Sequence, residues 1–136
     1  MAENPTGDRA SEQDTRTILI VDDDAATRKL LRRLIEELPT PTKIYEASDG
    51  DGAINLGHNI RPDLALVDIV LPGSGASGVL VCRELCRDTR TKVVIISGQA
   101  SDSVVHAALE LGAVEYVRKP FALEEMREKL MGWLAS

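Results

Sequence analysis

Short apolar runs alternate with stretches of helical periodicity along most of this chain, and this alternation restricts the possible folds more than any other feature of the sequence. Four runs rich in β-branched or aliphatic residues, at 17–21, 43–47, 64–67 and 92–96, predict strands. A weaker fifth run at 115–118 precedes a Lys-Pro pair that ends regular structure. The pattern therefore predicts five strands separated by helices.

The intervening stretches carry apolar residues at three- and four-residue spacing, which predicts amphipathic helices. The last helix is expected at about 122–134, with Glu125 and Lys129 at a favourable distance for an ion pair within the helix. The segment 50–59 is the least regular, because its three glycines lower helix propensity. Apolar positions that mark the other helices are Leu30, Leu31, Leu34, Ile35, Leu38, Leu80, Val81, Leu85, Val104, Val105, Ala108 and Leu109.

Strands that alternate with helices through short loops predict a parallel sheet covered by helices on both faces, because crossover connections between parallel strands are right-handed. The nearly continuous apolar character of 17–21 and 93–96 is typical of strands buried on both faces. In such open sheets a ligand binds beyond the carboxyl ends of the strands, where the strand order reverses. We therefore expect the functional residues there.

Composition excludes several classes of function. With a net charge of -6 and 3% aromatic residues, the chain is expected to make no direct contact with nucleic acid. The absence of a long apolar run predicts no membrane insertion, and a cytoplasmic location. Cys82 and Cys86, at helical spacing, are interpreted as reduced cysteines. Residues 1–16 are polar and are expected to form a flexible tail, with one folded domain over 17–136.

Polar residues follow four of the predicted strands directly. Asp22 and Asp23 end the first run, Asp68 ends the third, Ser97 ends the fourth, and Lys119 follows the fifth. Clustered carboxylates repel one another, so they favour a hard cation such as Mg²⁺. A lysine ammonium and a serine hydroxyl suit phosphoryl oxygens, and an aspartate is an established phosphoryl acceptor. The constellation indicates a site for a transferred phosphoryl group.

At these positions the sequence resembles the receiver domains of response regulators. The matching pieces are ILIVDDD at 18–24, PDLALVDIVLPG at 62–73, VVIISGQA at 93–100 and YVRKPF at 116–121, in the order of the family. The resemblance implies a flavodoxin-like, doubly wound α/β fold with five strands and five helices. It also implies a phosphoacceptor of two-component signalling rather than an enzyme with turnover.

The same resemblance assigns roles to single residues. Asp68 would accept the phosphoryl group and also belong to the Mg²⁺ site, where Asp23 would bind the ion directly and Asp22 through water. The backbone carbonyl of Val70 would be a further ligand. Ser97 and Lys119 would contact the phosphoryl oxygens, and Tyr116 would change rotamer together with Ser97 on activation.

One departure from the family lies in the loop after Asp68. Gly78 arrives about two residues later after Pro72 than the family pattern predicts, which leaves a lengthened, glycine-rich loop at 73–78. This insertion is either a recognition loop or neutral, and the neutral interpretation is favoured slightly, because surface loops tolerate insertions.

Two other functions remain as alternatives. A haloacid-dehalogenase-type phosphatase would use Asp22 as nucleophile and Asp24 two residues on, but Ala26 stands where a threonine is expected and Asp68 would have no role. Asp24 is also a candidate N-cap for the helix beginning at Ala25. The second alternative is an unphosphorylated scaffold, against which the intact Asp68, Ser97 and Lys119 argue.

The partners implied by the resemblance are a sensor histidine kinase or phosphotransfer protein upstream, and an effector protein or a second receiver downstream. The sequence leaves open whether the chain is a stand-alone regulator or a fragment of a longer protein.

Overall fold

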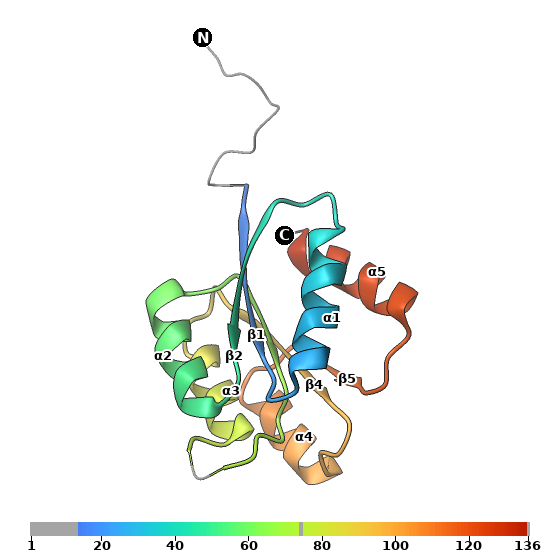
Figure 1. Cartoon of the computed structure of the whole chain (residues 1–136). Helices are drawn as coiled ribbons and strands as arrows, with labels where there is room; N and C mark the ends of the chain where they lie inside the picture. The colour runs from blue at the N-terminus through green and yellow to red at the C-terminus, as the bar shows by residue number, and fades with distance from the viewer. Residues whose placement is uncertain (1–13, 74, 136) are drawn as a thin grey trace.

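A computed structural model describes residues 14–73 and 75–135, in which five parallel strands form one sheet in the order β2-β1-β3-β4-β5. The flavodoxin-like topology predicted from the sequence is thereby confirmed. The strands and helices alternate along the chain (Figure 1). Their bounds are β1 Arg16–Val21, α1 Ala25–Glu36, β2 Thr42–Ala47, α2 Gly50–Ile60, β3 Leu64–Val67, α3 Gly78–Cys86, β4 Lys92–Ser97, α4 Asp102–Glu110, β5 Glu115–Arg118 and α5 Leu123–Leu134.

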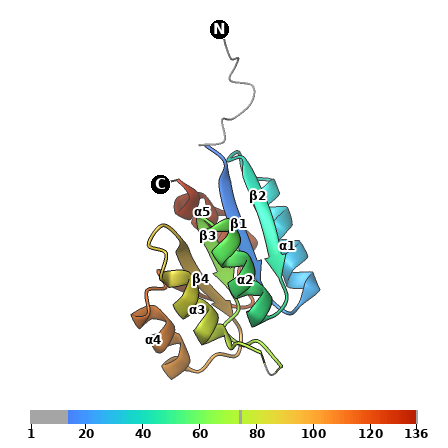
Figure 2. The ribbon, with the colours of Figure 1, turned by 90° about the vertical axis from the view of Figure 1, so that its left-hand side faces the viewer.

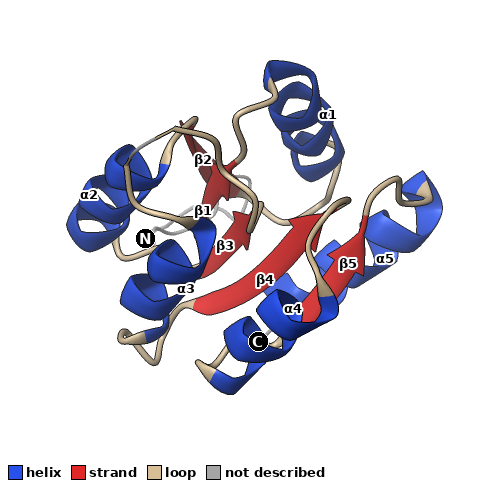
Figure 3. Cartoon of the chain, turned by 90° about the horizontal axis from the view of Figure 1, so that it is seen from below, coloured by secondary structure: helices blue, strands red, loops and turns tan. Residues whose placement is uncertain are grey.

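Two apolar cores lie on the two faces of the sheet. One is formed with α1 and α5, through side chains such as Leu31, Ile35 and Met126, and the other with α2, α3 and α4, through Ala53 and Val81 among others. The two helical layers are visible in Figures 2 and 3. Residues of β3 and the centre of β4 are buried throughout, as their continuous apolar sequence predicts.

The segment 50–59 is helical despite its three glycines, because its ends are capped and one face is buried. The Asp49 side chain accepts a hydrogen bond from the Gly52 N–H, and Arg61 ends the helix in the left-handed conformation, with a φ of 47°. Ala53 is fully buried against the sheet. Capping and tertiary burial therefore outweigh the low intrinsic propensity.

The first strand begins at Arg16, one residue before the predicted start at Thr17. Most of the predicted tail, residues 1–13, lies outside the described residues. No helix in the described part of the chain is long and apolar enough to cross a membrane.

Candidate functional site

The central acidic cluster is assembled by two adjacent strands. In the register of β1 with β3, Val21 lies beside Val67, so the residues that follow each strand are neighbours at the carboxyl edge. The Asp68 N–H donates to the Val21 carbonyl at 2.8 Å and continues the pairing past the strand end. The carboxylates of Asp22, Asp23 and Asp68 offer oxygen atoms that lie within 4.8 Å of one another.

A lysine that directly follows β5 reaches this cluster across the sheet. The Lys119 Nζ donates to Asp22 Oδ2 at 2.7 Å and to Asp68 Oδ2 at 3.0 Å. Burial opposes the charge of Lys119, but its two carboxylate partners together raise the pKa of this ammonium above its usual value. One ammonium against three carboxylates leaves two negative charges uncompensated, which favours a cation.

Backbone amides fix two of the three carboxylates. Asp22 Oδ1 accepts from the Asp24 N–H at 2.9 Å, and Asp68 Oδ1 accepts from the Val70 N–H at 2.9 Å. Burial is the largest influence on Asp22, which is 2% exposed, and it raises the pKa of this carboxyl even beside Lys119. Asp23 is instead exposed to solvent. Asp23 is thus the carboxylate of the cluster most accessible to an arriving ion.

Ser97 brings a hydroxyl group without a partner to the same edge. Its Oγ is buried and forms no hydrogen bond. Among the described residues it is the one buried side-chain nitrogen or oxygen atom in this situation. Buried polar atoms are nearly always satisfied, so an exception requires an explanation. A ligand oxygen in the adjacent hollow would supply the missing partner.

Tyr116 is turned toward the interior. Its hydroxyl donates to the Ser97 backbone carbonyl at 3.1 Å, and its ring packs against the core shared with α3 and α4. The Lys119 N–H donates to the same carbonyl at 3.1 Å. The carbonyl of Ser97 therefore links three of the residues that the sequence singled out.

These groups surround a hollow of about 420 Å³ at the carboxyl edge of the sheet. Sequence reasoning had named all of its charged groups, but it missed the contribution of Gln99 at the rim, although this residue lies in the quoted 93–100 motif. Asp22 is part of the carboxylate cluster, but it is buried and does not line the hollow. The lining residues are Asp23, Asp68, Val70, Pro72, Ser97, Gly98, Gln99 and Lys119.

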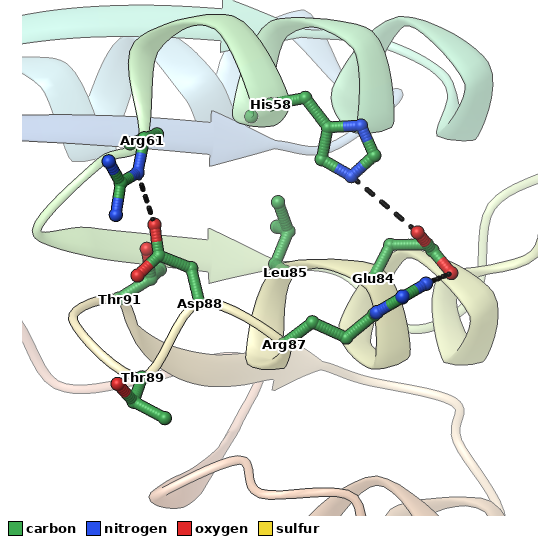
Figure 4. A pocket seen from close by; sticks show the side chains of 9 residues that line it. His58, Arg61, Glu84, Leu85, Arg87, Asp88, Thr89 and Thr91 are labelled. Carbon is green, nitrogen blue, oxygen red and sulfur yellow. Dashed lines mark hydrogen bonds and ion pairs between the residues drawn. The ribbon is translucent and has the colours of Figure 1, made fainter.

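A larger hollow, of about 620 Å³, lies between α2 and α3 at the opposite edge of the sheet (Figure 4). Its charged side chains pair with one another: Arg61 with Asp88 at 2.7 Å, and Glu84 with His58 and Arg87 at 3.5 Å each. Because these side chains pair within the hollow, its lining has no excess of positive or negative charge that would favour a charged ligand. The smaller hollow, which adjoins the uncompensated carboxylates, is therefore the stronger candidate site.

Three further kinds of polar side chain, an aspartate, two cysteines and a histidine, lie in surroundings that explain them without a ligand. Asp24 is the N-cap of α1, as predicted, and accepts hydrogen bonds from the Ala26 N–H and the Thr27 hydroxyl. Cys82 and Cys86 are free thiols on α3 with sulfur atoms 3.8 Å apart. His106 is exposed on α4 beside Glu110.

The family model of the response regulator receiver domain matches residues 18–131 of this chain. Response regulator MprA of Mycobacterium sp. (strain KMS) is 40% identical over 119 residues, which cover 86% of this chain and 50% of that protein. DNA-binding response regulator MtrA of Mycobacterium leprae is 35% identical over 109 residues, covering 80% of this chain and 47% of that protein. The chain thus spans about half the length of these relatives.

Solved structures give the same picture of the fold. A CheY-like response regulator receiver domain protein from Methanospirillum hungatei superposes with a TM-score of 0.77 at 27% identity, covering 89% of this chain and 94% of that one. The expectation that this chain avoids nucleic acid receives no support from these comparisons, since the name of MtrA describes it as DNA-binding.

Proposed function

Because this chain belongs to the response regulator receiver domain family, which acts in two-component signalling, we propose that Asp68 is its phosphoacceptor. We further propose that Asp22, Asp23, Ser97 and Lys119 serve the transfer, and that Tyr116 changes rotamer in response to it. The observation that carries the proposal is the position of Asp68. Its carboxylate ends a central strand, lines the hollow, and is held between the Lys119 ammonium and the Val70 N–H.

The donor set fits Mg²⁺. Mg²⁺ favours carboxylate and carbonyl oxygens and retains several waters, and a cluster with excess negative charge at the mouth of a hollow meets both requirements. Asp23 and Asp68 would bind the ion directly with the backbone carbonyl of Val70, and buried Asp22 would act through water. When bound, the ion would neutralise charge on the carboxylates and the phosphoryl oxygens.

In the transfer itself, an oxygen of Asp68 attacks the phosphorus of a phosphohistidine. The new O–P bond forms as the N–P bond breaks, and the imidazole leaves. Lys119 keeps its proton and stabilises charge on the phosphoryl oxygens, while the Ser97 hydroxyl donates the hydrogen bond that it lacks in the structure. The later loss of phosphate regenerates the carboxylate, so we propose a phosphoacceptor without further enzymatic turnover.

The phosphatase alternative is disfavoured by Asp24. In that mechanism Asp24 would exchange protons with the leaving group, but here its two carboxylate oxygens accept from Ala26 and Thr27 at the start of α1. The expected nucleophile Asp22 is 2% exposed and lies beneath Lys119. Asp68, by contrast, lines the hollow.

We propose that the output surface is formed by α4, β5 and α5. Ala108 is the single buried residue of α4 in the described structure, so this helix is weakly anchored. Helix α5 is held more firmly, since Lys129 and Trp133 both donate to Glu115 and Lys92 donates to the Trp133 carbonyl. A phosphoryl group that draws Ser97 and Lys119 inward would therefore move α4 first.

The proposed partners are a histidine kinase or phosphotransfer protein that supplies the phosphoryl group, and an effector protein or second receiver that contacts the output surface. Apolar side chains on that surface are exposed and available for such contacts. They are Leu109, Leu111, Val114, Leu123 and Met131.

The proposal is tested by incubating the full chain with acetyl phosphate and Mg²⁺ and measuring the intact mass. The wild type is expected to gain one acid-stable, base-labile phosphoryl group. Asp68→Asn is expected to gain none, because the amide is not a comparable nucleophile. Asp102→Asn, an exposed aspartate on α4, serves as the control and should label like the wild type. Labelling of Asp68→Asn to the wild-type extent would reject the assignment.

A further inference from the structure

The lengthened loop between β3 and α3 is closed at its base. A Cβ atom built on Gly78 would lie 2.2 Å from the Ile69 carbonyl oxygen, a distance that real Cβ atoms do not show. Gly78 therefore permits the two ends of the loop to touch. The two ends of the loop, at Ile69 and Gly78, lie in contact, as the ends of an Ω-loop do.

The far part of the loop packs on the first turn of α2. The Ala76 N–H donates to Asp51 Oδ1 at 3.1 Å, although 25 residues separate them. A Cβ atom on Gly50 would lie 1.9 Å from the Ala76 carbonyl oxygen, and one on Gly75 would lie 2.9 Å from Asp51 Oδ2. The Asp51 carboxylate thus rests against the backbone of residues 75–76, and the absence of a side chain at Gly50 lets the loop approach.

The same loop carries part of the phosphorylation site. Val70 and Pro72 line the hollow beside Asp68, and the Val70 N–H holds one oxygen of that carboxylate. A short stretch of backbone therefore connects the rim of the hollow with the contact at Asp51. We propose that Asp51 is a positioning residue, which holds the loop on α2 and thereby sets the placement of Val70 and Pro72 around Asp68.

This inference rests on the proposed function, because its consequences are expressed at the phosphorylation site. Without the Asp51 acceptor, the glycine-rich loop has more accessible conformations, and the Val70 carbonyl spends less time where an ion would bind it. Water also reaches the phosphoryl group more readily. Hydrolysis adds water at phosphorus and breaks the bond to the Asp68 oxygen, releasing inorganic phosphate and the free carboxylate.

The test uses the full chain as wild type, Asp51→Ala and Asp51→Asn. We expect Asp51→Ala to exchange its Ala76 amide hydrogen faster, to bind Mg²⁺ more weakly in calorimetry, and to lose the phosphoryl group sooner, each by at least about threefold, in line with the loss of one hydrogen bond. Asp51→Asn retains a carbonyl oxygen at the same position. It is expected to restore all three measurements toward the wild-type values.

Two further variants separate the loop contact from general effects. Asp102→Ala removes an acidic residue from the first turn of α4, as Asp51→Ala does from α2, and should behave like the wild type. Gly75→Ala places a methyl group against the Asp51 carboxylate and should reproduce the Asp51→Ala result from the loop side.

Two outcomes would overturn the inference. In the first, Asp51→Ala exchanges its Ala76 amide faster while Mg²⁺ affinity and phosphoryl lifetime stay at the wild-type values, so the contact does not position the site. In the second, Asp51→Asn behaves like Asp51→Ala, so the charge at the helix start is responsible. A wild type that accepts no phosphoryl group would reject the proposed function alone, because amide exchange and Mg²⁺ affinity still report on the loop.

Discussion

The phenolic oxygen of Tyr116 lies 3.1 Å from the backbone carbonyl oxygen of Ser97, and this hydrogen bond holds the tyrosine ring in its inward position. The two residues lie at neighbouring strands, at the end of β4 and within β5. A displacement of Ser97 toward the hollow would therefore act directly on Tyr116 through this hydrogen bond. The pair would thus connect the proposed phosphorylation site with α4, since Tyr116 packs in the same apolar cluster as Val104 and Ala108 of that helix.

The first prediction concerns this link. With beryllofluoride and Mg²⁺ as a phosphoryl substitute, the largest amide chemical shift changes outside the site are expected on α4 and β5. Ser97→Ala lacks the hydroxyl that the phosphoryl group would draw inward, so it should bind the substitute yet show smaller changes on α4.

Tyr116→Phe provides the companion measurement. It preserves the ring but removes the hydrogen bond to the Ser97 carbonyl, so the changes on α4 should again shrink while those around Asp68 remain. If Ser97→Ala and Tyr116→Phe both transmit the change to α4 as the wild type does, the link does not carry the signal.

A second prediction concerns Asp23, the exposed carboxylate of the cluster. Asp23→Ala should weaken Mg²⁺ binding by at least about tenfold, because a direct carboxylate ligand is lost. Folding should be unaffected, since the side chain lies at the surface. Calorimetry is a more suitable measurement than tryptophan fluorescence. The single tryptophan, Trp133, contacts Glu115 and Lys92 at the start of their strands, whereas the site lies where the strands end. Mg²⁺ affinity equal to that of the wild type would exclude Asp23 as a ligand.

Replacement of Lys119 is predicted to strengthen Mg²⁺ binding, in contrast to replacement of Asp23. The Lys119 ammonium lies 3.0 Å from Asp68 and repels an arriving cation. Lys119→Met should therefore bind Mg²⁺ at least about fivefold more tightly, which corresponds to about 1 kcal/mol of removed repulsion. The same variant should accept the phosphoryl group more slowly, because the charge that stabilises the phosphoryl oxygens is gone. Weaker Mg²⁺ binding by Lys119→Met would show that the lysine orders the carboxylates more than it repels the ion.

The fold and the charged residues of the site could be predicted from the sequence because both follow from local patterns. The strand ends at Val21 and Val67 fix where Asp22 and Asp68 lie, and parallel pairing brings them together. The contact between Asp51 and Ala76 could not be predicted, since it joins a loop to the first turn of a helix 25 residues away through packing that no spacing encodes. Lys129 likewise pairs with Glu115 of β5, where helical spacing had favoured Glu125.

The last prediction concerns how the free energy of unfolding depends on pH. It involves Glu46, a residue of β2 that pairs with two arginines of α1. Its carboxylate accepts from Arg32 at 2.7 Å and from Arg28 at 2.9 Å. The hydrogen bond from Arg32 is the main cause that lowers the pKa of Glu46, against the effect of burial, and Arg28 lowers it further.

A carboxyl group whose pKa is lower in the folded than in the unfolded state stabilises the fold above its unfolded pKa of about 4.3, and this stabilisation is lost as the pH falls through the folded value. Glu46→Gln should therefore lower the free energy of unfolding by about 1 kcal/mol near neutral pH, with a difference from the wild type that narrows below about pH 4. Urea unfolding across this pH range measures the difference. Glu36→Gln, which removes a more exposed partner of Arg32 at 3.5 Å, should show a smaller effect. A Glu46→Gln difference that stays constant with pH would mean that side-chain packing, and not the ion pairs, joins β2 to α1.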